Sequence, residues 1–173
     1  MCVAKSSGPT IASNVFRSNK ATDGGAIACT GAYAVIDGNT IGADGYPNEA
    51  DRDGGGIYCR EVTNTIIKNN VITWNEARGH GGGIAFYKCK LPTPRSPEKS
   101  CMHKNRITRN RASIGGGFSI LNTSNWAAVW NVIAGNIAQA GAGLYVSGST
   151  GSSAYVRALQ NNTIADNSCD DPF

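Results

Sequence analysis

A repeat built from asparagine, alanine and glycine runs through the whole chain and constrains its fold more than any other feature. The pattern is Asn-x-apolar-x-x-Asn-x-Ala, followed by a glycine run and another apolar residue, and its clearest copy lies between Asn70 and Ile84. The first asparagine of successive copies stands at positions 14, 39, 70, 105, 131 and 162. Such a period is typical of a solenoid, in which one unit cannot bury its apolar face without its neighbours.

The residues after each glycine run alternate between apolar and other types, as at positions 57–59 and 84–86. Alternation indicates β-strands with one buried face, and glycine runs suit turns better than helix interiors. We therefore expect a coil of parallel strands in which equivalent residues stack about 4.8 Å apart. In such a coil the repeated asparagines form hydrogen-bonded ladders, and the repeated alanine marks a tight corner.

Two columns of apolar residues are expected to form the core. The first column follows the first asparagine and consists of Phe16, Ile41, Ile72, Ile107, Ile133 and Ile164. The second follows the glycine run and consists of Ile27, Ile57, Ile84, Phe118 and Leu144. Cys29 and Cys59 share a register after their glycine runs, so we expect both to point inward as small buried residues.

The Gly-Gly-Gly-Ile-Tyr-Cys run at 54–59 and the asparagine blocks resemble the repeats of right-handed parallel β-helix proteins. These include pectate-lyase-like proteins and bacterial envelope proteins similar to the polymorphic outer-membrane proteins. The repeat and the resemblance predict an all-β fold, a single-stranded right-handed parallel β-helix of about six coils, with residues 1–173 as a single domain. The resemblance further implies an extracellular or cell-envelope location. It fixes no chemistry, because this scaffold carries lyases, hydrolases, adhesins and inert spacers.

The composition agrees with this class of protein. The chain has 173 residues with 22 glycines and only 16% charged residues, which suits one stacked β-domain. It contains no run of about 18 apolar residues, so no membrane span is expected, and residues 1–6 lack an apolar signal-peptide core. The last copy stops at Asn167 without a glycine run, which favours a fragment of a longer solenoid or an unusual cap. The sequence leaves the oligomeric state open.

The basic residues gather between positions 88 and 111, within a net charge of +4. Such a cluster creates a local positive field, and it belongs either to a solvated loop or to a site for a polyanion. Tyr87 is the only aromatic residue at this stretch, whereas a nucleic-acid site needs stacking aromatics. An acidic polysaccharide is therefore the better candidate, and no nucleic acid is expected. The candidate ligand-binding residues here are Lys88, Lys90, Arg95 and Arg106.

The residue before each glycine run forms a column that carries the candidate catalytic groups. In chain order it reads Asp23, Asp53, His80, Ile114 and Ala140. Copies two and three have one extra residue before the run, which predicts a bulge that re-aims side chains. Asp23, Asp53 and His80, with Arg52 and Arg78 beside them as ligand-binding residues, have the chemistry for acid and base roles in glycan cleavage. The alternative is ordinary Asp-Gly turn chemistry.

Further motifs point to individual groups without completing a known site. Gly79-His80-Gly81 resembles the triplet of polygalacturonase-type hydrolases, but that family's Asn-Thr-Asp triplet and its paired aspartate are missing. No cofactor is expected, although a cluster of acidic residues offers oxygen ligands for Ca²⁺ without the spacing of a defined loop; it comprises Asp44, Glu49, Asp51 and Asp53. The cysteines lack zinc-knuckle spacing, so no metal site is assigned.

Two insertions, at 42–53 and 90–100, are expected to project from neighbouring coils, as loops that wall a groove do in the β-helix proteins this chain resembles. Cys89 and Cys101 bracket the second, proline-rich insertion, and a disulfide at its neck would stabilise it in an oxidising compartment.

The leading functional hypothesis is a noncatalytic extracellular or envelope module that displays loops and binds acidic polysaccharide. A small polysaccharide lyase or glycoside hydrolase is the first alternative, and a purely structural spacer is the second.

Overall fold

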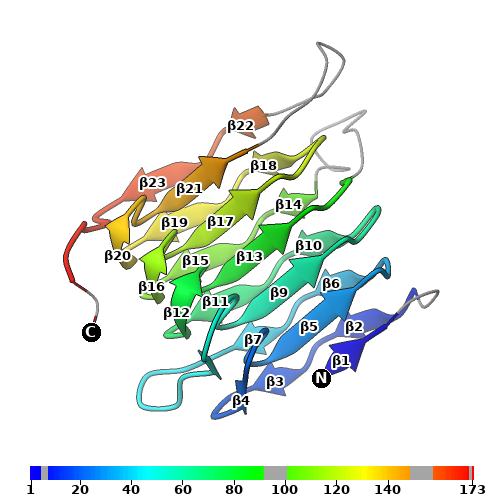
Figure 1. The fold of residues 1–173 in the computed structure, drawn as a ribbon, viewed down its shortest axis with the longest axis horizontal. Coiled ribbons are helices and arrows are strands. Elements are labelled where there is room, and N and C mark those ends of the chain that lie inside the picture. Colours follow the sequence, from blue (N-terminus) through cyan, green and yellow to red (C-terminus); the bar gives the residue numbers. More distant parts are fainter. Residues whose placement is uncertain (5–7, 92–100, 149–157, 172) are drawn as a thin grey trace.

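The computed structural model describes residues 1–4, 8–91, 101–148, 158–171 and 173. Within them all regular elements are β-strands, 23 in number, and they stack into four parallel sheets (Figure 1). Sheet A contains β1 (Cys2–Val3), β5 (Ile27–Thr30), β9 (Ile57–Arg60), β13 (Ile84–Tyr87), β17 (Phe118–Leu121) and β21 (Leu144–Ser147). Sheet B contains β2 (Thr10–Ala12), β6 (Val35–Asp37), β10 (Ile66–Lys68), β14 (Met102–His103), β18 (Ala127–Val129) and β22 (Ala158–Gln160).

The other two sheets are built in the same way. Sheet C contains β3 (Val15–Phe16), β7 (Thr40–Ile41), β11 (Val71–Thr73), β15 (Arg106–Thr108), β19 (Val132–Ala134) and β23 (Thr163–Ala165). Sheet D contains β4 (Lys20–Ala21), β8 (Glu49–Ala50), β12 (Glu76–His80), β16 (Arg111–Ile114) and β20 (Ile137–Ala140). Among the described residues no helix is long and apolar enough to cross a membrane.

The chain visits sheets B, C, D and A in turn and then begins the next coil, so each sheet gains one strand per coil (Figure 1). The register joins equivalent residues of the repeat: Ile72 pairs with Ile41 on one side and with Ile107 on the other. The predicted parallel β-helix of about six coils is therefore confirmed. Its right-handed sense stays a prediction, based on the resemblance to right-handed parallel β-helix repeats.

The predicted core columns are buried in the middle coils and open at the ends. Ile41, Ile72, Ile107 and Ile133 are fully buried, whereas Phe16 is half-buried and Ile164 is 46% exposed. The column of sheet A behaves alike, with only Leu144 of the last coil half-buried. End coils of a solenoid have a neighbour on one side only, which explains the difference.

Two asparagine ladders run along the corners that flank sheet C. In each ladder the backbone N–H and the side-chain Nδ2 of one asparagine donate to Oδ1 of the asparagine one coil further on, as Asn75 does to Asn110 at 2.9 Å for both bonds. The first ladder contains Asn14, Asn39, Asn70, Asn105, Asn131 and Asn162. The second contains Asn19, Asn48, Asn75, Asn110, Asn136 and Asn167, with Asn48 bound to Asn75 through its side chain alone.

The glycine runs exist because successive coils come into backbone contact there. A Cβ added to Gly82 would lie 2.3 Å from the carbonyl oxygen of Arg111, a distance that no real side chain tolerates. The alanines of sheet D form a separate small core of Ala50, Ala77 and Ala112. Both observations fit the tight corner that the repeated alanine predicts.

The insertion predicted at 42–53 is shorter than expected. The chain turns at Ala43–Tyr46 through backbone hydrogen bonds between those two residues, and it is back on the coil at Asn48. Asn48 accepts hydrogen bonds from the backbone and side chain of Asn19, so it restores the second ladder, and the following strand β8 pairs with β4 and β12. The spacing of the repeat did not identify Asn48 as a ladder residue, because the turn separates it from the rest of its copy. The second predicted loop lies largely outside the described residues, at 92–100.

The predicted disulfide between Cys89 and Cys101 is absent, because both are free buried thiols. The Cys89 thiol donates to the carbonyl oxygens of Cys59 (3.2 Å) and Tyr87 (3.3 Å), and Cys101 donates to that of Ala127 (3.1 Å). Each sulfur thus bonds backbone rather than the other cysteine. Cys29 and Cys59 do stack inward in register, as predicted.

We expect the buried thiols to resist alkylation in the native protein. Burial raises the pKa of Cys89 to about 11 and that of Cys101 to about 12, so little reactive thiolate forms at pH 8. Maleimide labelling followed by mass spectrometry should therefore modify the exposed Cys2 and Cys169 first, and Cys89 and Cys101 only after denaturation. A Cys89–Cys101 peptide pair recovered from unreduced native protein would contradict the structure.

Candidate functional site

The predicted column of titratable residues assembles where sheet D turns into sheet A. The backbone N–H of Asp53 donates to Oδ1 of Asp23 at 3.3 Å, and the backbone N–H of His80 donates to Oδ1 of Asp53 at 2.8 Å. The register between β12 and β16 shifts between Ala77 and His80, so the predicted bulge is present in copy three. Each aspartate therefore ties its own coil to the next one.

Glycine at position 79 makes the close approach of the Asp53 carboxylate possible. A Cβ on Gly79 would lie 2.5 Å from Oδ1 of Asp53, so any larger residue would displace the carboxylate. The His80 ring nitrogen Nδ1 is 3.1 Å from the same oxygen. Because an ionised carboxylate only accepts hydrogen bonds, the Nδ1–H group of His80 is the donor in this contact.

The two aspartates differ in their charged partners. Arg52 forms a two-pronged ion pair with Asp23, in which the Nε–Oδ1 distance is 2.9 Å. Burial alone would raise the pKa of Asp53, but the hydrogen bonds from the His80 side chain and backbone outweigh burial and lower it. Asp53 is consequently held as a carboxylate over a wide pH range.

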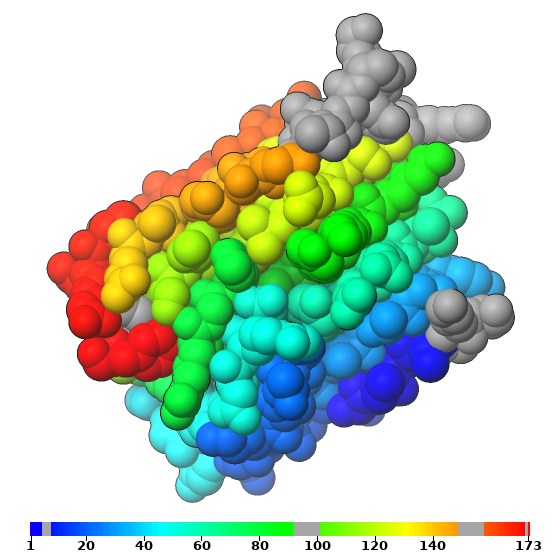
Figure 2. Space-filling view, in the orientation of Figure 1, coloured from blue at the N-terminus to red at the C-terminus, as the bar shows by residue number. Residues whose placement is uncertain are grey.

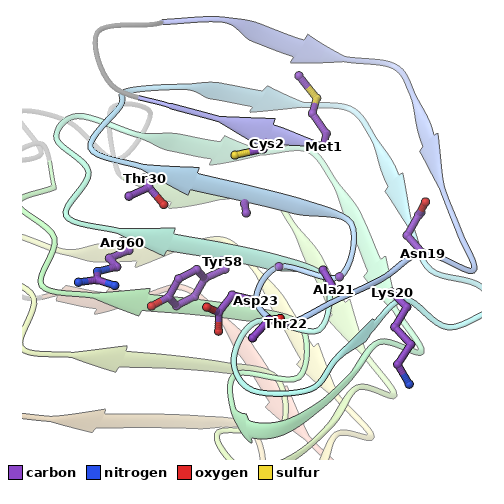
Figure 3. A pocket seen from close by; sticks show the side chains of 13 residues that line it. Met1, Cys2, Asn19, Lys20, Ala21, Thr22, Asp23, Thr30, Tyr58 and Arg60 are labelled. Atoms are coloured by element: carbon purple, nitrogen blue, oxygen red, sulfur yellow. The ribbon is translucent and has the colours of Figure 1, made fainter.

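A groove opens beside this column on the outer face of sheet A. It has a volume of about 350 Å³, and its lining comprises Arg52, Asp53, Tyr58, Arg60, His80, Tyr87 and Leu121. A second hollow of about 530 Å³ shares Tyr58 and Arg60 and continues over coils one and two. Figure 3 shows the Tyr58 ring next to Asp23, with Arg60 on the same strand. The two hollows meet at these residues, so the groove runs in the direction in which the coils stack.

Tyr58 is well buried although its strand position faces outward. Burial, with the charges of Asp23 and Asp53, raises the pKa of its hydroxyl to about 12. The hydroxyl is thus protonated at neutral pH and remains a hydrogen-bond donor at the centre of the groove.

The other predicted ligand-binding residues do not all reach this groove. Arg78 lines a different hollow on sheet D, together with Lys20, Glu49 and Asp51. Lys88 lies over the ring of Tyr87, 5.1 Å from its centroid, and so borders the groove. Lys90 is exposed at the turn between sheets A and B, and Arg106 lies on sheet C. Arg95 lies outside the described residues.

The four acidic residues considered for Ca²⁺ are dispersed. Glu49 and Asp51 pair with Lys20 at 3.1 and 3.7 Å, Asp53 bonds His80, and Asp44 is exposed in the short turn. Over the described part of the chain, no group of three or more acidic, histidine or cysteine side chains is arranged to hold a metal ion.

Two tryptophans beside the basic residues were missed by the sequence analysis. Arg109 lies over the ring of Trp74 and Lys104 over that of Trp130, both at 5.5 Å from the centroid. Trp74 and Trp130 stand immediately before asparagines of the two ladders, and reading that column along the repeat would have found them. The basic stretch therefore has aromatic neighbours in space, although Tyr87 is the only aromatic residue beside it in the sequence.

No protein-family model, curated protein or solved structure matches the chain. The resemblance to pectate-lyase-like and envelope β-helix proteins is thus supported at the level of the fold alone.

Proposed function

We propose that this protein is a noncatalytic β-helix module that binds an acidic polysaccharide along the groove of sheet A. The observation that carries the proposal is the shape and lining of the groove, which extends over several coils and presents two tyrosines beside two arginines. An extended ligand fits an extended groove, and aromatic rings with a few placed polar groups are the usual lining of ligand sites.

One arginine of the groove, Arg60, is free to exchange its partner. Arg60 pairs with Glu61 at 3.3 Å, and both side chains are nearly half exposed. Exposed ion pairs of this kind contribute little to stability, so a ligand carboxylate or sulfate can replace Glu61 at small cost. Arginine also binds carboxylate groups through two parallel hydrogen bonds.

Cleavage is the second candidate function, and the hydrogen bond between Asp53 and His80 is the observation that favours it. A glycosidase needs a carboxyl group whose pKa is raised so that it can act as an acid. The pKa of Asp53 is lowered instead, which supports binding over hydrolysis. His80 remains a candidate base for a lyase.

The location is proposed only from the ligand class. An extracellular or envelope position suits a polysaccharide ligand. Because Cys89 and Cys101 are free thiols, no disulfide supports an oxidising compartment. The pectate-lyase-like kinship likewise remains a proposal.

The test is titration of the protein with polygalacturonate oligomers, with and without Ca²⁺, and with dextran as the uncharged control. We expect saturable binding of the uronate, and a loss of about ten-fold or more in affinity for Arg60→Gln, because a charge-assisted hydrogen bond is removed. The matched control is Arg17→Gln, an exposed arginine that lies over Tyr46 away from the groove. Absence of binding across acidic glycans would favour the spacer, and cleavage that His80→Ala abolishes would favour the enzyme.

A further inference from the structure

A group of cations lies on one coil at the outer face of sheet C and its corners. None of them lines the groove of sheet A. Lys104, Arg106, Arg109 and Arg111 are all exposed, and they occupy the two corners of sheet C, strand β15 between them and the start of β16. Arg106 projects outward from β15, since its neighbour Ile107 is buried in the core. Lys104 and Arg109 have positive φ angles, 55° and 56°, and each precedes an asparagine of a ladder. We call these four residues the coil-four cations.

The coil-four cations have no acidic partners within the described part of the chain. The ion pairs there involve Lys20, Arg52, Arg60, Lys68 and His80, and all of them lie elsewhere. Even Arg111, whose register partner on coil three is Glu76, forms no ion pair with it. Four like charges on one coil repel one another. A ligand of opposite charge would relieve this repulsion.

The two tryptophans next to the coil-four cations occupy costly backbone positions. Trp74 and Trp130 have φ angles of 59° and 56°, in the left-handed region that bulky residues avoid. The left-handed conformation recurs at these corners along the solenoid, where the other residues that adopt it are Ser13, Ser18, Gly38, Asn69, Lys104, Arg109, Gly135, Asn161 and Asp166. At this turn the chain thus points a side chain away from the core, and Trp130 is 38% exposed, so part of its ring is open to a ligand.

Each tryptophan is held by a cation from the neighbouring coil. Arg109 of coil four lies over Trp74 of coil three, and Lys104 of coil four lies over Trp130 of coil five. The two rings therefore flank the cations at opposite corners of sheet C. Between them lie Thr73 and the buried Thr108, which are joined by a hydroxyl hydrogen bond at 3.2 Å. The cations and the two rings thus share one side of the solenoid across three coils.

We propose that the coil-four cations, with Trp74 and Trp130, form a binding surface for a linear acidic polysaccharide, separate from the groove of sheet A. The cations would contact the carboxylates or sulfates, and the exposed ring of Trp130 would pack against an apolar sugar face. Nucleic acid fits this surface less well. Successive bases need neighbouring open rings on which to stack, whereas here the rings are two coils apart and one face of each is covered by a cation.

This surface is independent of the groove, because sheets A and C line different sides of the core (Figure 1). Figure 2, in the orientation of Figure 1, shows the coils stacked in chain order from the N-terminal to the C-terminal end. The two sites share a ligand class, and separate variants of the two faces distinguish them.

The experiment compares binding of the full chain to polygalacturonate, heparin, a short DNA duplex and dextran at low and physiological salt. We expect Arg106→Gln/Arg109→Gln to weaken binding of the acidic polysaccharides about ten-fold or more, and to make the remaining binding less sensitive to salt. Trp130→Ala should weaken binding without altering the circular dichroism spectrum. Arg17→Gln, an exposed arginine on coil one, is the matched control and should bind like the wild type.

The outcomes separate the two surfaces. Weaker polysaccharide binding by the Arg106→Gln/Arg109→Gln protein, with unchanged binding by Arg60→Gln, supports the surface on sheet C and overturns the groove. Weaker binding by Arg60→Gln alone overturns the surface on sheet C. Weaker binding by both proteins supports both sites. Tighter binding of DNA than of either acidic polysaccharide, lost in the same double variant, would also overturn the proposal, because it would assign the surface to nucleic acid.

Discussion

Replacing Ile72 with alanine is expected to lower the free energy of unfolding by about 2–5 kcal/mol, as for other large-to-small substitutions in packed cores. Ile72 is fully buried and pairs in register with Ile41 and Ile107. Its loss leaves a cavity in the middle of the solenoid, where coils on both sides are held in place by their own neighbours. Urea denaturation followed by far-ultraviolet circular dichroism measures the change.

The control is the adjacent residue of the same strand. Val71 points outward and is 38% exposed, so Val71→Ala should change the free energy of unfolding by no more than about 1 kcal/mol. Equal effects of the two substitutions would mean that the inward and outward faces of β11 have been assigned wrongly.

Replacing Asn110 with alanine should cost a similar amount, about 3 kcal/mol, through lost hydrogen bonds rather than lost packing. Oδ1 of Asn110 accepts from both the backbone N–H and the Nδ2 of Asn75 at 2.9 Å, and its own Nδ2 donates to Ile72 and to Asn136. Alanine leaves the buried N–H of Asn75 without this partner, and the unmet N–H alone costs about 1–3 kcal/mol.

The same ladder supplies the control for this prediction. Asn19 is the first residue of this ladder and is exposed, and its side chain donates to Arg17 and Asn48. Asn19→Ala should therefore cost less than about 1 kcal/mol, the net value of an ordinary hydrogen bond. A loss at Asn19 as large as that at Asn110 would show that burial does not set the strength of the ladder.

The repeat predicted the fold because every coil needs the same residue types at the same positions. An asparagine is needed wherever a corner must bond to the next coil, and a glycine is needed wherever coils touch through backbone. Position within the repeat therefore assigned Ile72 and Ile84 to the core without knowledge of the structure. The place of Asn48 in the second ladder was not predicted, because an inserted turn separates it from the preceding asparagine of its copy.

The candidate site could be predicted only in part. The column of Asp23, Asp53 and His80 follows from the repeat, and the bulge follows from one extra residue. The disulfide predicted between Cys89 and Cys101 is absent, although the two residues stand at the ends of an insertion. The direction of each thiol depends on the carbonyl groups around it, which the sequence does not show.

The repeat alone indicates which residues face inward, since stacking copies of one unit fixes the buried face of all of them. The contacts between outward side chains are visible only in the folded protein. Arg52 reaches back to Asp23, Arg109 covers Trp74, and Lys104 covers Trp130, in each case across the gap between two coils. Such contacts join residues whose separation in the chain varies from coil to coil, because the connections differ in length. They depend on the directions that long outward side chains take between neighbouring coils, which the repeat does not specify.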